Sequence, residues 1–226
     1  MMVTCAVLMA EMEALGTEQN RKIYRRHGAA SPEVFGLSYA HLGKLQKKVR
    51  VDHELAKQLW ATGNHDARVL AARIADPKQT DRALLDQWVH DLGDYILTDA
   101  FSEHAGKTAL AAEMMAQWIE SDEEWIGSTG WNVLGLLALK DNSLPDSFFE
   151  PYLALIERDL HHAKNRVRYA MNNALIAIGG RSESLKSQAM QAARHIGVVT
   201  VDHGETGCKT PDATSYIEKM WARKKA

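Results

Sequence analysis

The sequence predicts an all-α protein built as a right-handed superhelical stack of helical repeats. Apolar residues recur at steps of three or four over long segments, the spacing that places them on one face of a helix. Alternating runs rich in Val, Ile and Thr, which are typical of strands, are nearly absent. Only GVVTVDHG near residue 200 suggests an extended segment. Short segments rich in Gly, Pro, Asn and Asp lie between the helical ones and supply a stop and a new cap.

The helical segments group into pairs. We expect helices over residues 55–60 and 66–75, 84–89 and 94–101, 110–119 and 123–139, and 149–160 and 166–178, with a fifth unit starting at Leu185. The pair starts are 26 to 39 residues apart, close to the spacing of HEAT or armadillo repeats. In such a stack the second helix of each pair lines the concave face. We expect one domain over residues 1–226, with residues 197–226 as a C-terminal loop and capping segment.

Composition narrows the class of protein. The chain has 226 residues, of which 46% are hydrophobic, enough for a substantial core. It contains no apolar run of about 18 residues that would span a membrane, and its first residues carry no basic leader. Cys5 and Cys208 lie far apart in the sequence, which favours free thiols of a reducing compartment. These features predict a cytoplasmic protein that does not bind membranes.

Charge is unevenly distributed along the chain. Residues 1–75 carry 11 Lys and Arg against 7 Asp and Glu, residues 76–160 carry 5 against 17, and residues 161–226 carry 11 against 5. Two basic ends therefore flank an acidic middle. This pattern is consistent with two basic surfaces that hold an anionic polymer, and equally with charge spread over solvated helix faces.

One segment, WVHDLGDYILTDAF from Trp88 to Phe101, places Asp99 among apolar and aromatic residues at helical spacing. Tyr95 and Asp99 are four residues apart and therefore share a helix face. An acid at this position is either a solvated residue near a helix end or a functional carboxylate. Spacing alone favours the solvated residue.

Motifs for other chemistries are missing from the sequence. The ten histidines form no HExxH pair, and the chain has no GxxxxGK[ST], GxGxxG or GxSxG motif. We therefore expect no cofactor and no metal. Asp202, His203 and Cys208 are chemically suitable metal ligands, but their spacing matches no standard zinc pattern, and a turn in which they cap and pack is favoured. Asn172 and Asn173, in an otherwise apolar helix, must find hydrogen-bond partners. In a cleft the partner would be DNA, and in a core it would be the backbone of a neighbouring helix.

Several segments resemble a known family in order and spacing over roughly residues 15–200. They are GTEQNRKIYRRHGAASPEVFGLSYAHLGKL, ELAKQLWATGNHDARVLAARIAD, the segment containing Tyr95 and Asp99, DEEWIGSTGWNVL and NRVRYAMNNALIAIG. They are similar to the DNA alkylation repair proteins of the AlkD type. The resemblance implies a C-shaped stack of HEAT-like repeats that holds duplex DNA in a basic concave cleft. It also implies a DNA glycosylase that excises cationic N3- or N7-alkylpurines without flipping the base into a pocket.

The family signature is a tryptophan four residues before a catalytic aspartate, followed by an arginine and a second tryptophan from the next two repeats. By this resemblance the aspartate falls on Asp99 and the preceding aromatic residue on Tyr95. The arginine falls at or near Ser128, and the second tryptophan falls near Asn173, so both are absent. Trp131, one turn after Ser128, is either a replacement aromatic wall or ordinary core packing.

The chemistry of the family indicates which residue matters most. A cationic alkylpurine is already a good leaving group, so its departure needs stabilisation of the developing oxocarbenium ion, which a carboxylate near the sugar supplies. We therefore assign Asp99 and Tyr95 to catalysis. The candidate nucleic-acid-binding residues are Trp131, Asn173, Lys164, Arg166, Arg168, Lys47 and Lys48.

The sequence thus predicts a protein of alkylation repair with double-stranded DNA as its partner. Two alternatives remain open. One is a non-catalytic DNA-structure binder on the same scaffold, because the arginine and the second tryptophan are absent. The other is a protein-interaction solenoid that uses the same concave face. The oligomeric state is left open.

Overall fold

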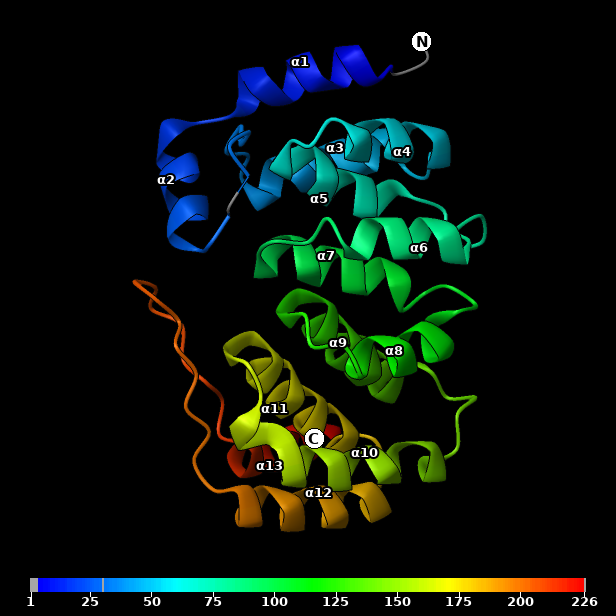
Figure 1. Cartoon of the computed structure of the whole chain (residues 1–226), viewed down its shortest axis with the longest axis vertical. Helices are drawn as coiled ribbons and strands as arrows, with labels where there is room; N and C mark the ends of the chain where they lie inside the picture. Colours follow the sequence, from blue (N-terminus) through cyan, green and yellow to red (C-terminus); the bar gives the residue numbers. More distant parts are fainter. Residues whose placement is uncertain (1–3, 30, 226) are drawn as a thin grey trace. The chain divides into compact units, whose positions relative to one another are not determined.

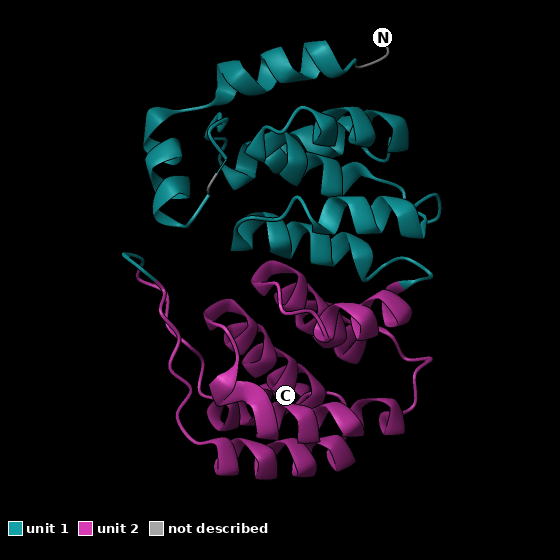
Figure 2. Ribbon diagram, viewed as in Figure 1, with its two compact units in different colours: residues 1–110, 204–206 teal, residues 111–203, 207–226 magenta. Residues whose placement is uncertain are grey.

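The computed structural model describes residues 4–29 and 31–225, and within these ranges the chain is helical with no strand (Figure 1). The prediction of an all-α helical-repeat fold is confirmed. The chain divides into two compact units, residues 4–110 with 204–206 and residues 111–203 with 207–225 (Figure 2). We call them unit 1 and unit 2. The expectation of one domain over residues 1–226 stays a prediction.

Unit 1 begins with three helices that precede the predicted pairs. Its helices are α1 (Cys5–Leu15), α2 (Glu18–Arg26), α3 (Tyr39–Val49), α4 (His53–Ala61), α5 (His65–Ile74), α6 (Arg82–Val89) and α7 (Tyr95–Ala105). Those of unit 2 are α8 (Ala111–Ile119), α9 (Glu124–Lys140), α10 (Asp146–Asp159), the 3-10 turn η1 (Leu160–His162), α11 (Asn165–Gly179), α12 (Glu183–Ile196) and α13 (Ala213–Lys225). The helix pairs expected between residues 55 and 178 are all present.

Side-chain caps explain where the helices begin. Asp52 accepts a hydrogen bond from the amide of Leu55 at 3.0 Å, and Asn64 accepts one from Ala67 at 3.1 Å. Asp81 caps α6 in the same way. An oxygen at the N-cap satisfies an amide that has no partner within the helix. The breaker segments of the sequence therefore mark the helix starts to within a few residues.

The core of unit 1 is centred on two stacked tryptophans. The rings of Trp60 on α4 and Trp88 on α6 have centroids 4.1 Å apart and planes at 3°. Phe101 on α7 lies tilted against Trp60 at 6.1 Å. Each of these three side chains is at most 2% exposed. The stack therefore ties α4, α6 and α7 into one layer of packing.

In unit 2, α9 is buried along most of its length. A Cβ added at Gly130 would lie 2.6 Å from the backbone nitrogen of Ile119, so α8 and α9 approach each other more closely than any side chain allows. On another part of α9, Gly135 faces Ala174 of α11 at ordinary contact distance. Small residues thus let α9 lie against both neighbours.

The C-terminal segment differs from the expected loop. Residues 197–203 form no strand, and the chain ends in helix α13 within the described range. Ile217 of α13 is fully buried, and a Cβ at Gly179 of α11 would lie 2.6 Å from it. Trp221 donates from Nε1 to the carbonyl of Gly179 at 2.8 Å. Residues 197–226 were expected as a C-terminal loop and capping segment, and the last 13 residues of the segment's described range form a helix that packs on α11. The expectation for the segment as a whole stays a prediction.

No helix in the described part of the chain is long and apolar enough to cross a membrane.

Candidate nucleic-acid interface

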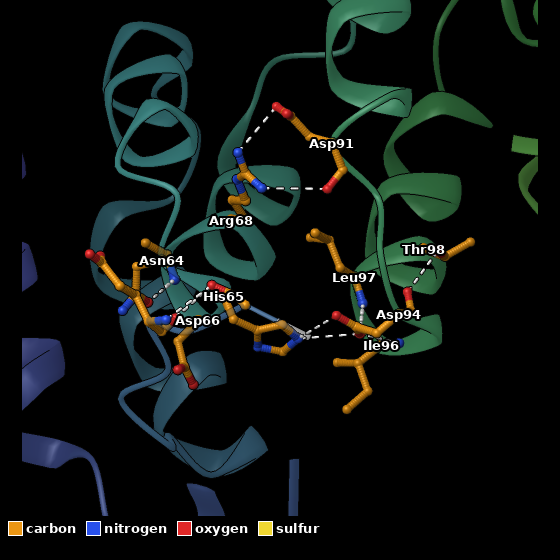
Figure 3. A network of polar contacts seen from close by, with 12 residues as sticks. Asn64, His65, Asp66, Arg68, Asp91, Asp94, Ile96, Leu97 and Thr98 are labelled. Atoms are coloured by element: carbon orange, nitrogen blue, oxygen red, sulfur yellow. Dashed lines mark hydrogen bonds and ion pairs between the residues drawn. The ribbon is translucent and has the colours of Figure 1, made fainter. Parts of the chain in front are cut away.

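A buried acid fixes the start of α7. Asp94 is 3% exposed and accepts hydrogen bonds from the amides of Ile96 at 2.9 Å and Leu97 at 3.0 Å. Its carboxylate also lies 3.2 Å from Nε2 of the buried His65 on α5 (Figure 3). The cap makes Tyr95 the first residue of α7, and the contact with His65 holds that end of α7 against α5.

A second buried acid fixes the entry to α3. Asp66 is fully buried and accepts hydrogen bonds from three consecutive amides, those of Phe35 at 2.8 Å, Gly36 at 3.0 Å and Leu37 at 2.8 Å. Gly36 has φ +81°, and a Cβ there would meet the carbonyl oxygen of Thr17 at 2.6 Å. The hydroxyl of Tyr24 on α2 donates to the carbonyl of Leu37. These hydrogen bonds therefore hold α2 and α5 against the segment that leads into α3.

The loop before α7 is fastened to α4 and α5 by Asp91 (Figure 3). Its Oδ2 accepts a hydrogen bond from Nε1 of Trp60 at 2.7 Å and lies 3.3 Å from a guanidinium nitrogen of Arg68. Arg68 and Asp91, with His65 and Asp94, line a pocket of about 450 Å³ in unit 1. The polar network holds the end of α7 that carries Tyr95.

This framework brings the two predicted catalytic residues to the surface of α7. Asp99 is exposed and Tyr95 is half-buried, one helical turn apart. The hydroxyl of Tyr95 contacts Nδ1 of His27, which directly follows α2, and the two ring centroids are 5.7 Å apart. The catalytic roles of Tyr95 and Asp99 stay predictions.

Two further residues belong to the same surface. Tyr39 begins α3, and the guanidinium of Arg73 on α5 lies 5.4 Å from the centroid of its ring. Partial burial raises the pKa of Tyr39 above its usual value, Arg73 opposes the rise, and the carboxylates of Asp99 and Asp94 add to it. Asp99 is thus close enough to act electrostatically on Tyr39. We call His27, Tyr39, Arg73, Tyr95 and Asp99 the Tyr95 cluster.

Sequence reasoning did not find three members of this cluster. His27, Tyr39 and Arg73 come from three separate segments that only tertiary packing brings together. Tyr39 and His27 lie within the segment that resembles the family, GTEQNRKIYRRHGAASPEVFGLSYAHLGKL, but no spacing rule links either of them to Asp99. The only local sequence feature that points to this region is the pair of arginines, Arg25 and Arg26, directly before His27.

The predicted cations on α3 are exposed. Lys47 and Lys48 both lie at the surface in the last turn of α3. Lys48 forms an ion pair with Glu11 of α1 at 2.6 Å. Lys47 is therefore the better placed of the two for a phosphate contact, and both remain predicted binding residues.

The predicted cations of unit 2 divide into two kinds. The guanidinium of Arg168 donates to the carbonyls of Thr200 at 2.9 Å and Ala163 at 3.0 Å, so it holds the C-terminal segment against α11. Lys164 is exposed and donates to the carbonyl of Asp122. Arg166 lies over the ring of Tyr169 at 5.0 Å. Lys164 and Arg166 have the positions more suited to an anionic partner.

The positions where the family signature is altered are partly buried. Ser128 is 3% exposed and its hydroxyl donates to the carbonyl of Trp125. Trp131 is 4% exposed, packs edge-on against Tyr152 at 6.3 Å, and lines a pocket of about 390 Å³ in unit 2. Asn173 is half-buried. Most of the Trp131 ring is therefore occupied in packing, and its role as an aromatic wall stays a prediction.

The segment after residue 200 is held by hydrogen bonds. Asn165 exchanges two of them with the backbone of Asp202, at 2.8 and 2.7 Å. His203 lies 3.0 Å from the hydroxyl of Thr210 and edge-on to Tyr169. Asn172 donates from its side-chain nitrogen to the carbonyl of Pro211 at 2.9 Å, whereas its buried Oδ1 has no hydrogen-bond partner among the described residues. Among the described residues, no three His, Cys, Asp or Glu side chains gather as metal ligands do.

Comparison with known proteins gives consistent results. A sequence profile of the DNA alkylation repair enzyme family matches residues 8–217. The chain is 33% identical over 229 residues to an uncharacterised protein of Listeria monocytogenes, covering 99% of this chain and 100% of that protein. It is 32% identical over 223 residues to an uncharacterised protein of Listeria innocua, covering 96% and 97%.

One solved structure matches with a TM-score of 0.88 and 32% identity, covering 98% of this chain and 95% of that one. It is described as a new family of proteins related to the HEAT-like repeat DNA glycosylases, with affinity for branched DNA structures. The resemblance read from the sequence is therefore confirmed in both fold and family. The chain belongs to the DNA alkylation repair enzyme family.

Proposed function

We propose that the protein binds DNA, that branched DNA is its preferred form, and that duplex arms are held by its basic surfaces. The observation that carries this proposal is the contact between His27 and Tyr95, because it places the basic end of α2 beside α7. The solved structure with affinity for branched DNA supports the choice of partner, since it is similar to this chain over nearly the whole length.

The charges on α2 suit a phosphate backbone. Lys22, Arg25 and Arg26 are exposed on this helix, while Tyr24 is buried beneath them. Glu18 is the only acid within α2, and it pairs with Arg21 at 2.8 Å. Three exposed cations therefore lie on the helix that leads to His27, without a carboxylate in their own helix to neutralise them all. Displacement of counterions from phosphates by such residues gives affinity that falls steeply with salt.

Fluorescence anisotropy with a labelled four-way junction and a duplex of the same length tests this function. We expect tighter binding to the junction, and an affinity for both DNAs that falls linearly with salt on logarithmic axes. The double variant Arg25→Ala/Arg26→Ala should reduce the steepness of this dependence by about two. The matched control is Lys57→Ala/Lys78→Ala, which removes two exposed cations elsewhere in unit 1.

No binding to either DNA at low salt would contradict the proposal and would favour a protein-interaction solenoid. If the α2 variant and its control change the salt dependence of affinity equally, the protein still binds DNA, but α2 is not part of the interface.

A second candidate function is excision of cationic N3- or N7-alkylpurines. It is favoured by Asp99, which is exposed one turn after Tyr95 on a helix whose start is fixed by Asp94. A carboxylate at the DNA surface stabilises positive charge on the sugar as the base departs. The family signature residues missing near Ser128 and Asn173 make this the weaker of the two functions.

Release of alkylpurines from methylated DNA separates the two candidates. An active protein should lose at least a hundredfold of its rate in Asp99→Asn, which keeps the shape of the side chain but removes its charge. DNA affinity should be unchanged or slightly higher in this variant. If the wild-type protein releases no base while it binds DNA, it is a non-catalytic DNA-structure binder.

A further inference from the structure

Tyr39 is the one exposed aromatic side chain among the described residues of unit 1. It is 56% exposed, whereas the other aromatic side chains of the unit are buried or half-buried. An isolated exposed aromatic ring needs no explanation by itself. Tyr39 differs because its position is fixed: α3 begins at this residue, with Ser38 as the cap, and the preceding residues are pinned to Asp66.

A cation is held against the same ring. The guanidinium of Arg73 lies 5.4 Å from the ring centroid of Tyr39, within the range of a cation–π interaction. The backbone of Arg73 is tied to α3, because Gln46 donates to its carbonyl at 3.4 Å. Arg73 is half-buried in the last turn of α5. An aromatic plane and a planar cation are thus presented together by two packed helices.

Asp99 acts electrostatically on the Tyr39 side chain of this pair. The carboxylate of Asp99 is close enough to raise the pKa of the Tyr39 phenol, after the larger effect of partial burial. The phenol is therefore uncharged at neutral pH and does not repel phosphate. An exposed ring beside a guanidinium suits a ligand with a flat face and an anionic backbone.

We propose that Tyr39 and Arg73 form a stacking platform for an unpaired base of branched DNA, Tyr39 packing on the base while Arg73 lies toward the adjoining phosphate. This inference rests on the proposed DNA binding. Bases at the branch point of a fork or junction are readily unstacked, whereas bases within a duplex are covered by their neighbours. Stacking on an aromatic residue needs only the face of a base. The platform accordingly contributes to the preference for branched over duplex DNA and is independent of base sequence.

A forked DNA with 2-aminopurine as the unpaired base at the branch point tests the platform. Stacking quenches this fluorescent base, so we expect strong quenching when the wild-type protein saturates the fork. In Tyr39→Leu the quenching should be lost and the affinity for the fork should fall roughly tenfold. Affinity for a plain duplex should stay the same. Tyr39→Phe keeps the ring and should behave as wild type.

The matched control is Tyr216→Leu in unit 2. Tyr216 is 48% exposed and has the ammonium of Lys219 at 5.5 Å from its ring centroid, so it is a similar exposed aromatic–cation pair in the other unit. This variant should keep both quenching and affinity. Arg73→Gln should weaken binding to fork and duplex alike and lower the steepness of the salt dependence by about one.

The outcomes distinguish this inference from the function on which it rests. If the wild-type protein binds neither DNA, the proposed function fails. If it binds the fork and Tyr39→Leu retains full quenching and affinity, DNA binding stands and the platform is wrong. Equal losses in Tyr39→Leu and Tyr216→Leu would also contradict it.

Discussion

The acidic residues in and around the Tyr95 cluster differ in burial and in the hydrogen bonds that their carboxylates accept. The carboxylates of Asp66 and Asp94 are buried and accept hydrogen bonds from backbone amides. Asp91 is bound by Trp60 and Arg68. These three acids maintain the fold of unit 1. Asp99 is exposed on α7, so its carboxylate can meet a ligand from solvent.

His104 predicts a pH dependence of stability. Burial, with a smaller contribution from Lys107, lowers the pKa of His104 from 6.5 to about 4. Between pH 6.5 and about pH 4, the imidazole of His104 is protonated in the unfolded chain but neutral in the folded protein. The free energy of unfolding should therefore fall by about 3 kcal/mol between pH 7 and pH 4. Urea denaturation at a series of pH values measures this.

The control for this prediction is His104→Gln. Glutamine carries no proton to titrate but can still reach Thr80, whose hydroxyl lies 2.9 Å from Nε2 of His104. Its stability should change far less between pH 6.5 and pH 4. The carboxylates with lowered pKa, such as Asp76 and Asp141, contribute stability that is lost only at more acid pH. A loss of equal size in wild type and His104→Gln would show that another group titrates in this window.

Sequence reasoning at the residue scale identified part of the candidate site. Tyr95 and Asp99 lie on one helix, so their spacing and the family signature were sufficient to select them. Tyr39 and Arg73 could not be selected, because their meeting depends on how α3 packs on α5. Arg168 illustrates the opposite case: its charge suggested a phosphate contact, but its guanidinium is bound to backbone carbonyls of the C-terminal segment.

At the scale of elements, the N-cap of α7 governs the position of Tyr95. We expect Asp94→Ala to lower the free energy of unfolding by about 2–4 kcal/mol, because α7 loses its cap and the buried His65 loses the partner of Nε2. Affinity for branched DNA should also fall, since Tyr95 directly follows the cap. Urea denaturation and anisotropy on the same variant measure both effects.

The conservative variant Asp94→Asn keeps an oxygen at the cap and should lose less stability than Asp94→Ala. If Asp94→Ala is as stable as wild type, the cap does not hold α7 as described. If stability falls while DNA affinity is retained, the position of Tyr95 does not matter for binding.

The helix pairs were predictable because residues next to each helix in the sequence determine where it begins. Asp52, Asn64 and Asp81 each cap the helix that follows, and Asn64 and Asp81 lie in the short segments GNHD (63–66) and DPKQTD (76–81) between the predicted helices. Helix α13 was missed because it follows a long irregular segment rich in Gly, Thr and Pro, and because its stability comes from burial of Ile217 and the Trp221 hydrogen bond to α11. Those contacts join residues about forty positions apart, which no local pattern reveals.

At the scale of the whole molecule, the distribution of charge is more informative than its sum. The net charge is −2, yet residues 1–75 have an excess of four cations and residues 161–226 an excess of six. Part of this excess has structural roles, as in Arg168 and in Lys48 with Glu11. The exposed cations of α2 precede His27, the residue that contacts Tyr95. Affinity for DNA should therefore depend on a limited set of phosphate contacts rather than on net charge.

The central claim is that the protein binds branched DNA through the Tyr95 cluster. Hydrogen–deuterium exchange of the full chain, with and without a saturating four-way junction at low salt, tests it most directly. We predict slower exchange in the presence of the junction for amides of residues 22–29 and 95–105, with little change in α4 and α6. Unchanged exchange in both of these segments, under conditions where anisotropy shows the junction bound, would contradict it.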